Sequence, residues 1–428
     1  MHPYSPERRT ALVLCGTGAH GAYHAGALRA LQEAGVKIDV VAGQGVGAAG
    51  AAVAAIDGAA TLWAEGGLWR SPSVASLYPV RRAVRLGATL VLAIVALMLL
   101  AVAVTAAGIP VQTLARVALG AALLGAATAV VLARVKGGAR RRAIGAWWWR
   151  FLGAPIDAAP MRARVAGAIW QLIRGAAPDA SPSGAVFGRR YSEWLSENLS
   201  QPGFRELMVI ATDVDTRRDV VAALLREPYR QAFVASRPGR ERKAEVIDLA
   251  GAGRDHALDI VAGALTPPLG CDLHPITFAP DSFWRGETHR LCDHPGSIGR
   301  LLTELEMAGV TQAILVSATA SETAPHRLTS PRLDIRGRIG EFVAAAQSAA
   351  IREALDAPRA RFDGIYVICP AHNPVGPFDV GGAYDEASDR RHTLLELMER
   401  AYQDAYHQFI EPVVGASGDH LARPAPPD

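Results

Sequence analysis

The stretch ALVLCGTGAHGAYHAGALRALQEAGVKIDVVAGQGVGAAGAAVAAI, residues 11–56, decides the fold. Two short apolar runs, residues 11–15 and 38–42, each lead into a glycine-rich turn. A segment with helical spacing follows each turn, at residues 23–34 and 46–56. Alternation of short apolar runs with helices is typical of a parallel sheet that helices cover on both faces. The stretch therefore predicts an α/β fold with a mainly parallel central sheet.

Further strands and helices are expected later in the chain. The expected strands are residues 207–212, 312–317 and 364–369, and the expected helices include residues 298–307 and 392–409. We expect residues 1–80 and 150–428 to form the two parts of one soluble domain, because both contain segments of the same alternating kind.

A long uncharged segment separates these two parts. Residues 86–107 contain no charged side chain and, at about 1.5 Å per residue, extend about 33 Å as a helix. Residues 117–133 form a second, shorter uncharged run after a break at Gly108 and Pro110. We therefore predict a transmembrane hairpin at residues 86–133. The alternatives are two buried core helices, or a hairpin that re-enters or lies on the membrane surface.

Basic residues flank the predicted hairpin on both sides. They are Arg81, Arg82 and Arg85 before it, and Arg134, Lys136, Arg140, Arg141 and Arg142 after it. Positive residues favour the cytoplasmic side, so both ends of the hairpin are expected there. This predicts a bacterial-type inner (cytoplasmic) membrane, or another membrane, with the soluble domain on the cytoplasmic side.

Charge and cysteine content narrow the possible partners. The 428 residues carry a formal net charge of +3, and no basic patch is interleaved with aromatic residues, so we expect no nucleic-acid partner. The four cysteines form no CxxC pair and are expected to be reduced thiols. We expect no metal and no cofactor. Membrane lipid is the expected partner, and the sequence does not indicate a protein partner.

The first glycine-rich turn contains Gly16, Thr17, Gly18, Ala19, His20 and Gly21. Glycines between a strand and a helix expose backbone N–H groups that can hold an anion or a developing oxyanion. The spacing of Gly16, Gly18 and Gly21 also fits a dinucleotide-binding loop. However, the next strand ends at Gly43 and lacks the acidic residue that such a loop needs. A turn without any ligand is the third alternative.

The second turn has the frame of a nucleophile elbow, G-x-S-x-G, with glycine at its centre. It consists of Gly43, Gln44, Gly45, Val46 and Gly47. The central residue of an elbow has a strained backbone, which costs about 1–3 kcal/mol for a residue with a β-carbon. Gly45 is predicted to relieve this strain while removing the attacking oxygen.

Two such turns in this order resemble the patatin-like phospholipase family. That family uses the first turn as an oxyanion hole and a Ser–Asp dyad for ester hydrolysis. The resemblance implies a patatin-like three-layer fold, with Gly16 to Gly21 as the oxyanion turn and Gly45 at the nucleophile position. Thr17 and His20 depart from the family pattern. His20 stands where the family has a cation, and it supplies one only when protonated, below about pH 6.5.

The resemblance also suggests the dyad aspartate. The family's Asp-Gly-Gly motif corresponds best to Asp293-His294-Pro295, because the length from Asp293 to Gly309-Val310 suits the family pattern. Asp379, in the segment 373–391, is the second candidate, although that segment is expected to be a solvated loop.

These features favour a pseudoenzyme that keeps a lipid-binding cleft and a membrane anchor. It would act in lipid binding or in scaffolding at the membrane. The alternative is an active lipid acyl hydrolase with an atypical site, in which Asp293 activates a water. A nucleotide- or phosphate-binding module is the least favoured reading.

Overall fold

The computed structural model describes residues 4–106, 120, 125, 153–177, 180–182, 184–235, 242, 244–278, 280, 284–319, 334–356, 362–385 and 388–415. The chain divides into two compact units. One consists of Met1–Tyr78 and Ala158–Asp428, and the other of Pro79–Asp157. The first unit contains every described strand and is an α/β domain.

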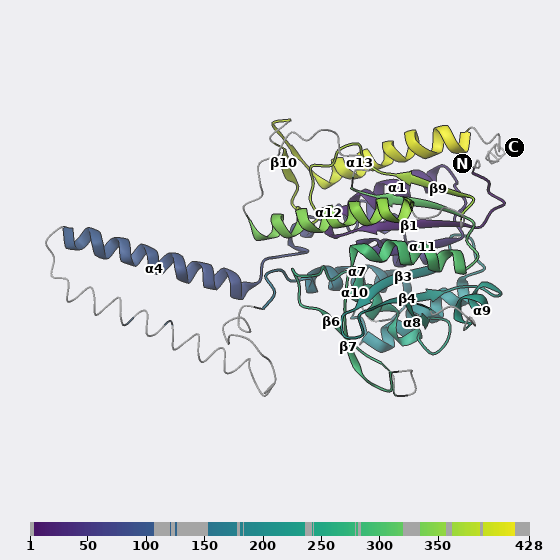
Figure 1. Cartoon of the computed structure of the whole chain (residues 1–428), viewed down its shortest axis with the longest axis horizontal. Coiled ribbons are helices and arrows are strands. Elements are labelled where there is room, and N and C mark those ends of the chain that lie inside the picture. Colours follow the sequence, from purple (N-terminus) through teal and green to yellow (C-terminus); the bar gives the residue numbers. More distant parts are fainter. Residues whose placement is uncertain are drawn as a thin grey trace. The chain divides into compact units, whose positions relative to one another are not determined.

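A nine-stranded sheet lies at the centre of the first unit (Figure 1). Its strands are β1 (Thr10–Gly16), β2 (Val40–Gly45), β3 (Glu206–Asp213), β4 (Arg218–Leu224), β5 (Ala244–Asp248), β6 (His274–Thr277), β7 (Thr288–Cys292), β8 (Gln312–Ser317) and β9 (Gly364–Ile368). The order is β5-β4-β3-β2-β1-β8-β9, with β7 paired to β3 and β6 paired to β7. A separate hairpin contains β10 (Ala383–Asp385) and β11 (Arg390–His392).

The sheet is mainly parallel, as the sequence predicts. β1 pairs in parallel with β2 and β8, β2 with β3, and β8 with β9, whereas β4 and β7 run antiparallel to β3. Every residue of β1 and β2 is buried. A parallel strand that is covered on both faces consists of nearly continuous apolar residues. For this reason these two strands are evident in the sequence.

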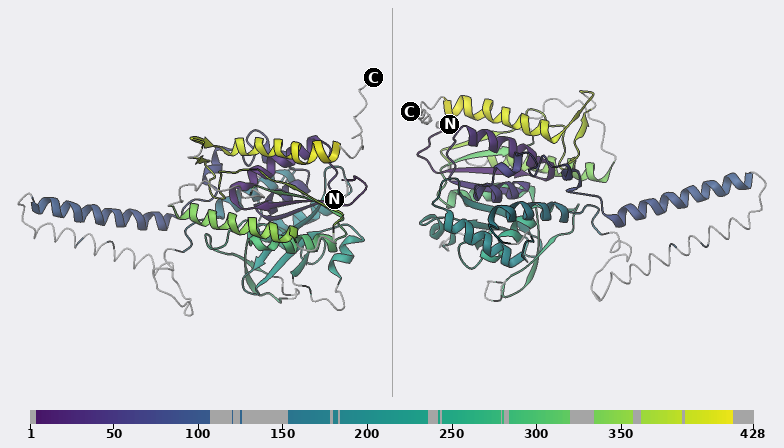
Figure 2. Two further views of the ribbon diagram at one scale, coloured as in Figure 1. Left: turned by 45° about the horizontal axis from the view of Figure 1, so that its top comes forward. Right: turned by 180° about the vertical axis from the view of Figure 1, so that it is seen from behind.

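Helices cover both faces of the sheet and give the domain three layers. They are α1 (Gly21–Glu33), α2 (Val46–Ala55), α3 (Ala60–Trp63), α7 (Ala159–Ile173), α8 (Gly184–Asn198), α9 (Tyr229–Val234), α10 (Ala257–Ala264), α11 (Ile298–Met307), α12 (Ile335–Asp356) and α13 (Leu394–Ala405), which continues into a π-helical segment, Tyr406–Val414. α11 and α12 pack on one face, while α1, α2 and α10 pack on the other. Figure 2 shows α13 lying along α1.

The amphipathic helix α11 shows how the core is built. Ile298, Leu301, Leu302 and Leu305 recur at helical spacing and are buried against alternate residues of β1, β2, β3 and β8. Each fully buried side chain of this kind contributes about 2 kcal/mol relative to exposure. The helix has the bounds expected from the sequence, because its apolar stripe is regular.

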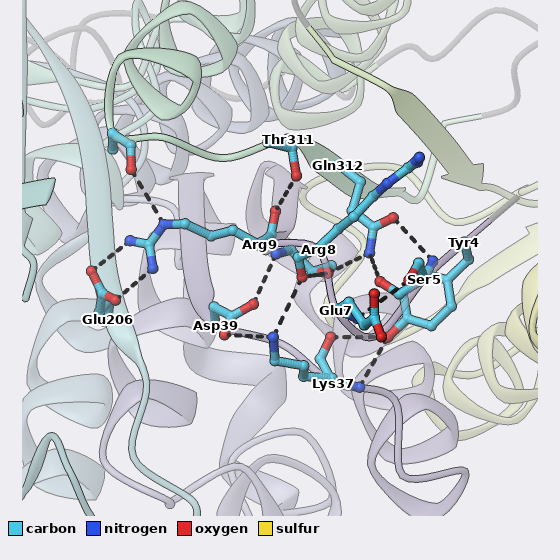
Figure 3. Close-up of polar contacts among 12 residues, drawn as sticks. Tyr4, Ser5, Glu7, Arg8, Arg9, Lys37, Asp39, Glu206, Thr311 and Gln312 are labelled. Carbon is cyan, nitrogen blue, oxygen red and sulfur yellow. Dashed lines mark hydrogen bonds and ion pairs between the residues drawn. The ribbon is translucent and has the colours of Figure 1, made fainter. Parts of the chain in front are cut away.

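The amino end of the sheet is fixed by a buried ion pair (Figure 3). Arg9, just before β1, donates from Nη1 and Nη2 to the two carboxylate oxygens of Glu206 at 2.8 and 2.7 Å. Its Nε also donates to the carbonyl of Ala308, and its guanidinium lies 3.6 Å from the centroid of the Tyr229 ring. The N-terminal segment is therefore attached to β3 and to the turn that follows α11.

The second unit begins and ends with paired backbone. Arg81 N donates to Pro155 O at 2.9 Å, and Asp157 N donates to Pro79 O at 3.0 Å. Between them, α4 (Arg82–Ala106) is a 25-residue helix with exposed apolar side chains, for example Leu86 and Leu92 at 66% and 68%. Pairing of its two ends makes this unit an insertion into the α/β domain.

Among the described residues, no helix combines the length and apolarity needed to cross a membrane. The predicted transmembrane hairpin is therefore unsupported. Residues 86–106 of its first span fall on α4. Residue 107 and, apart from Gly120 and Gly125, the second span at residues 117–133 lie outside the described residues.

Candidate active site

The first glycine-rich turn leads from β1 into α1 at the carboxyl end of the sheet. Gly18 has a φ of +58°, and a β-carbon there would lie 2.0 Å from the carbonyl oxygen of Pro377. A β-carbon on Gly21 would lie 2.1 Å from the Trp69 ring. Position 18 therefore requires glycine for two reasons, its positive φ and the lack of space for a β-carbon. The residues predicted for this turn, Gly16, Thr17, Gly18, Ala19, His20 and Gly21, are all buried.

The second turn, from β2 into α2, has the tight geometry of an elbow. Gly45 ends β2 with φ +62° and ψ −131°, a conformation that residues with side chains rarely adopt. A β-carbon on Gly47 would lie 2.0 Å from the carbonyl oxygen of Leu14, and one on Gly43 would lie 2.3 Å from that of Gly47. The flanking glycines therefore let strand and helix approach closely, as the elbow frame requires.

Asp293 reaches this turn from β7. The register of β7 on β3 pairs Cys292 with Thr212 and so brings the next residue to the carboxyl end of the sheet. Asp293 Oδ2 accepts a hydrogen bond from Thr17 Oγ1 at 2.8 Å, and Oδ1 accepts one from Gln44 Nε2. The carboxylate is 1% exposed. Residues from three distant parts of the sequence thus meet around one buried acid.

Burial controls the protonation of Asp293. Desolvation raises its pKa to about 7, and the hydrogen bonds from Thr17, Gln44 and the backbone of His294 offset only part of this effect. All three partners are neutral groups. A carboxyl group with this pKa is partly ionised near neutral pH, which suits a general base.

Asp293 faces the position where a side chain at residue 45 would begin. A β-carbon on Gly45 would lie 2.9 Å from Asp293 Oδ2. It would also lie 2.1 Å from the carbonyl oxygen of Gly16, which is far closer than van der Waals contact. A serine at position 45 therefore has the right neighbour for a Ser–Asp dyad but no room unless the end of β1 shifts.

A second backbone carbonyl fills the first turn. Ala19 N donates to the carbonyl oxygen of Pro377 at 2.7 Å. In an oxyanion hole such an N–H group faces the carbonyl of the substrate. The segment that carries Pro377 is held by Arg336 Nη2, which donates to Phe378 O at 2.7 Å, and by Asn373 Nδ2, which donates to Ala318 O at 3.0 Å. A carbonyl group of the protein itself, that of Pro377, therefore accepts the hydrogen bond of this N–H group.

The prediction of a solvated loop at residues 373–391 is therefore wrong for its first part. Val375 and Phe378 are buried, and Phe378 packs edge-on against Tyr78 with ring centroids 5.6 Å apart. The apolar residues Val375, Pro377 and Phe378 were the available signal. Sequence reasoning missed that this segment covers the glycine-rich turn.

Asp379, the second candidate for the dyad, has a local role. Its Oδ2 accepts a hydrogen bond from Gly376 N at 2.9 Å and closes a turn within the covering segment. Asp293 supplies the acidic atom next to Gly45. Among the described residues, no cluster of three His, Cys, Asp or Glu side chains could hold a metal ion.

The prediction that His20 can supply a positive charge is also wrong. Its side chain is buried, and desolvation together with the nearby His24 lowers its pKa to about 3. Burial likewise lowers the pKa of His24 to about 4, and His24 Nε2 lies 3.0 Å from Cys15 O. Both rings are neutral at physiological pH, so the turn carries no cationic side chain from them.

The comparison with protein-family models agrees with this architecture. The model of the patatin-like phospholipase family matches residues 12–250, which is more than half of the chain. The chain belongs to the patatin-like phospholipase family. Among solved structures, VipD from Legionella pneumophila is similar, with 13% sequence identity and a TM-score of 0.34 over 96% of this chain and 67% of that one. No curated protein matches the chain.

The patatin-like match includes both glycine-rich turns and Gly45, and it ends before Asp293. The role suggested for Asp293 therefore rests on geometry, namely its burial and its distance from Gly45. Family membership gives the fold and the location of the site, while the chemistry depends on the residues present there.

Proposed function

We propose that this patatin-like protein binds lipid at a membrane and has lost serine-based ester hydrolysis. The observation that carries the proposal is the environment of Gly45. The elbow backbone is present and Asp293 faces it, but no hydroxyl stands at the position between them. Acyl transfer by this route needs a nucleophile, and losing one typically removes most of the rate gain.

Two carbonyl groups support impaired catalysis. The Gly16 carbonyl occupies the space where a side chain at position 45 would begin, and the Pro377 carbonyl occupies the N–H of Ala19. Substrate would have to displace the second of these before its own carbonyl could use the turn. Restoring only the hydroxyl, by Gly45→Ser, should therefore fail to give full activity.

The membrane part of the proposal rests on α4. Its exposed apolar residues are Leu86, Leu90, Val91, Leu92, Ile94, Val95, Met98, Leu99, Leu100 and Val102. At 100° per residue these positions surround the helix, so the apolar surface lacks the polar face of a helix that packs on a soluble domain. Lipid tails are the partner that matches such a surface.

We further propose that the α/β domain faces the cytoplasm. Arg81, Arg82 and Arg85 precede or begin α4, and basic residues next to apolar helices favour that side. No disulfide joins Cys15, Cys271, Cys292 and Cys369, all of which the structure describes, and this agrees with a reducing compartment.

A second candidate function is weak ester hydrolysis at an atypical site. The observation that favours it is Asp293, whose pKa of about 7 suits a general base at neutral pH. Its hydrogen-bond partners, Thr17 Oγ1 and Gln44 Nε2, are neutral, so no ion pair offsets the cost of burying its charge.

The test is ester hydrolysis by the detergent-purified full chain, with short-chain acyl esters and mixed phospholipids as substrates. Asp293→Ala and Gly45→Ser are measured in parallel, and lipids that co-purify are identified by mass spectrometry. Bound lipid without hydrolysis above background supports the binding role. Rapid hydrolysis that Asp293→Ala abolishes contradicts it and favours the hydrolase. Full activity in Gly45→Ser alone contradicts the proposed closure by backbone carbonyls.

Membrane association is tested by flotation with phospholipid vesicles. The double variant Leu92→Asp/Leu99→Asp should lower the bound fraction at least about tenfold, because a charge in a lipid-facing helix is strongly unfavourable. Val186→Asp on α8 is the matched control, since Val186 is also an exposed apolar residue. Equal flotation of all three proteins would exclude α4 as the membrane contact.

A further inference from the structure

With glycine at position 45, the hydroxyl partner of Asp293 is that of Thr17. Oδ2 is the oxygen that a side chain at Gly45 would meet, and it accepts a hydrogen bond from Thr17 Oγ1 at 2.8 Å. Thr17 and Asp293 are 2% and 1% exposed, so water does not compete for this bond. We infer that Thr17 and Asp293 form a substitute dyad in which the threonine hydroxyl accepts an acyl group from a lipid ester.

The two oxygens of the Asp293 carboxylate accept hydrogen bonds from different donors, and this supports the assignment. Gln44 Nε2 holds Oδ1, whereas Oδ2 is left to the hydroxyl of Thr17. A nucleophile bonded to a base that a third group orients is the general arrangement of hydroxyl-based acyl transfer. Gln44 is the positioning residue in this arrangement.

The same turn offers a site for the ester carbonyl. Ala19 N lies two residues after Thr17 and already holds a carbonyl oxygen, that of Pro377, at 2.7 Å. The geometry of the turn is therefore compatible with a carbonyl group close to the threonine. An ester that displaces Pro377 could place its carbonyl on the Ala19 N–H, two residues along the same turn from Thr17. This inference rests on the proposed binding of lipid at this site.

The reaction then balances in two steps. Thr17 Oγ1 bonds to the ester carbonyl carbon while its proton moves to Asp293, and that proton passes to the departing alcohol as the C–O bond breaks. Water next attacks the acyl-threonine, which releases the fatty acid and restores the hydroxyl. Because Pro377 must first leave, we expect labelling and turnover to be slow.

The experiment uses a fluorophosphonate probe on the full chain in phospholipid vesicles, followed by peptide mass spectrometry. The probe forms a P–O bond with an activated hydroxyl and releases fluoride. We expect an adduct on Thr17, a loss of labelling of more than tenfold in Thr17→Val and Asp293→Asn, and retained labelling in Thr17→Ser. Thr61→Val, which removes a half-buried hydroxyl bonded only to the Gly58 carbonyl at 2.7 Å, is the matched control and should label normally.

Access of the probe to Thr17 is tested with a variant that loosens the segment carrying Pro377. Arg336→Ala removes the hydrogen bond to Phe378 O and should increase labelling of Thr17. Absence of an adduct on Thr17 in both the wild type and Arg336→Ala overturns the inference. Labelling of the chain that persists at the wild-type level in Thr17→Val also overturns it. Co-purified lipid is measured on the same samples, so that failure of labelling with lipid still bound overturns the role of Thr17 but leaves the lipid-binding proposal intact.

Discussion

The two ends of the central sheet bury a carboxylate in opposite ways. At the amino end, Glu206 receives a bidentate hydrogen bond from Arg9 and a further bond from the backbone of Arg226. At the carboxyl end, Asp293 receives hydrogen bonds only from neutral groups. Glu206 is compensated in charge, whereas Asp293 has its pKa raised to about 7 by burial.

This difference separates a structural acid from a functional one. A buried charge with a matched partner holds elements together, while one without a partner lowers stability and tends to mark a site where protons move. At the carboxyl end, Gly18 and Gly45 have positive φ and lie against backbone carbonyls, so this end of the sheet combines backbone constraint with a poorly compensated acid.

The largest effect is expected at the amino end, in Arg9→Met. This change leaves Glu206 buried without its cation and should lower the free energy of unfolding by about 3–5 kcal/mol. Urea unfolding of the detergent-solubilised protein measures it. The double variant Arg9→Met/Glu206→Met removes both charges and should recover most of the loss. A loss below about 1 kcal/mol in the single variant would mean that this ion pair contributes little.

At the carboxyl end, Gly45→Ala should lower the free energy of unfolding by about 3 kcal/mol. The strain of a positive φ accounts for part of this, and displacement of the Gly16 carbonyl for the rest. Gly175→Ala is the matched control, because Gly175 has a φ of +55° but open space around its β-carbon. Unfolding curves for the two variants should differ by more than about 1 kcal/mol. Equal losses would show that the Gly16 carbonyl moves aside freely.

These positions also show how far the sequence predicts the molecule. β1 and β2 were evident because both faces are covered, and the elbow frame around Gly45 was evident from its glycines. β6 and β7 were missed because they are short and partly exposed, so their pattern resembles that of a loop. The contact between Ala19 and Pro377 could not be predicted, because it joins residues from the two ends of the chain and depends on tertiary packing.

The choice of Asp293 as the candidate acid followed from its spacing to a later strand. The burial and the pKa of its carboxyl group could not be predicted in this way. The sequence placed His20 in the first turn as a possible cation, and burial instead makes that ring neutral. Desolvation depends on every element packed around a residue, whereas a motif specifies only the neighbours along the chain. For this reason the location of the site was predictable and its electrostatics were not.

An effect of similar size concerns pH. The pKa of Asp293 is raised in the folded protein, so between about pH 4 and pH 7 the folded state binds more protons than the unfolded state and stability falls as pH rises. Asp293→Asn does not titrate, and we expect its free energy of unfolding to exceed that of the wild type by about 4 kcal/mol at pH 8, with the difference vanishing near pH 4. Urea unfolding at several pH values measures this. A difference that is independent of pH would contradict the uncompensated acid.

The smallest effect is expected in Thr17→Val. Its hydroxyl stabilises the ionised form of Asp293, so removing it should raise the pKa of Asp293 further. The loss in the free energy of unfolding should be about 1 kcal/mol at pH 5, where the acid is protonated, and about 2 kcal/mol at pH 8.5, where the bond is charge-assisted. Thr61 donates to a backbone carbonyl in the wild type, so Thr61→Val should show the same loss at both pH values. If both variants respond equally to pH, the hydroxyl of Thr17 does not stabilise the ionised carboxylate, and the contrast with the amino end would rest on burial alone.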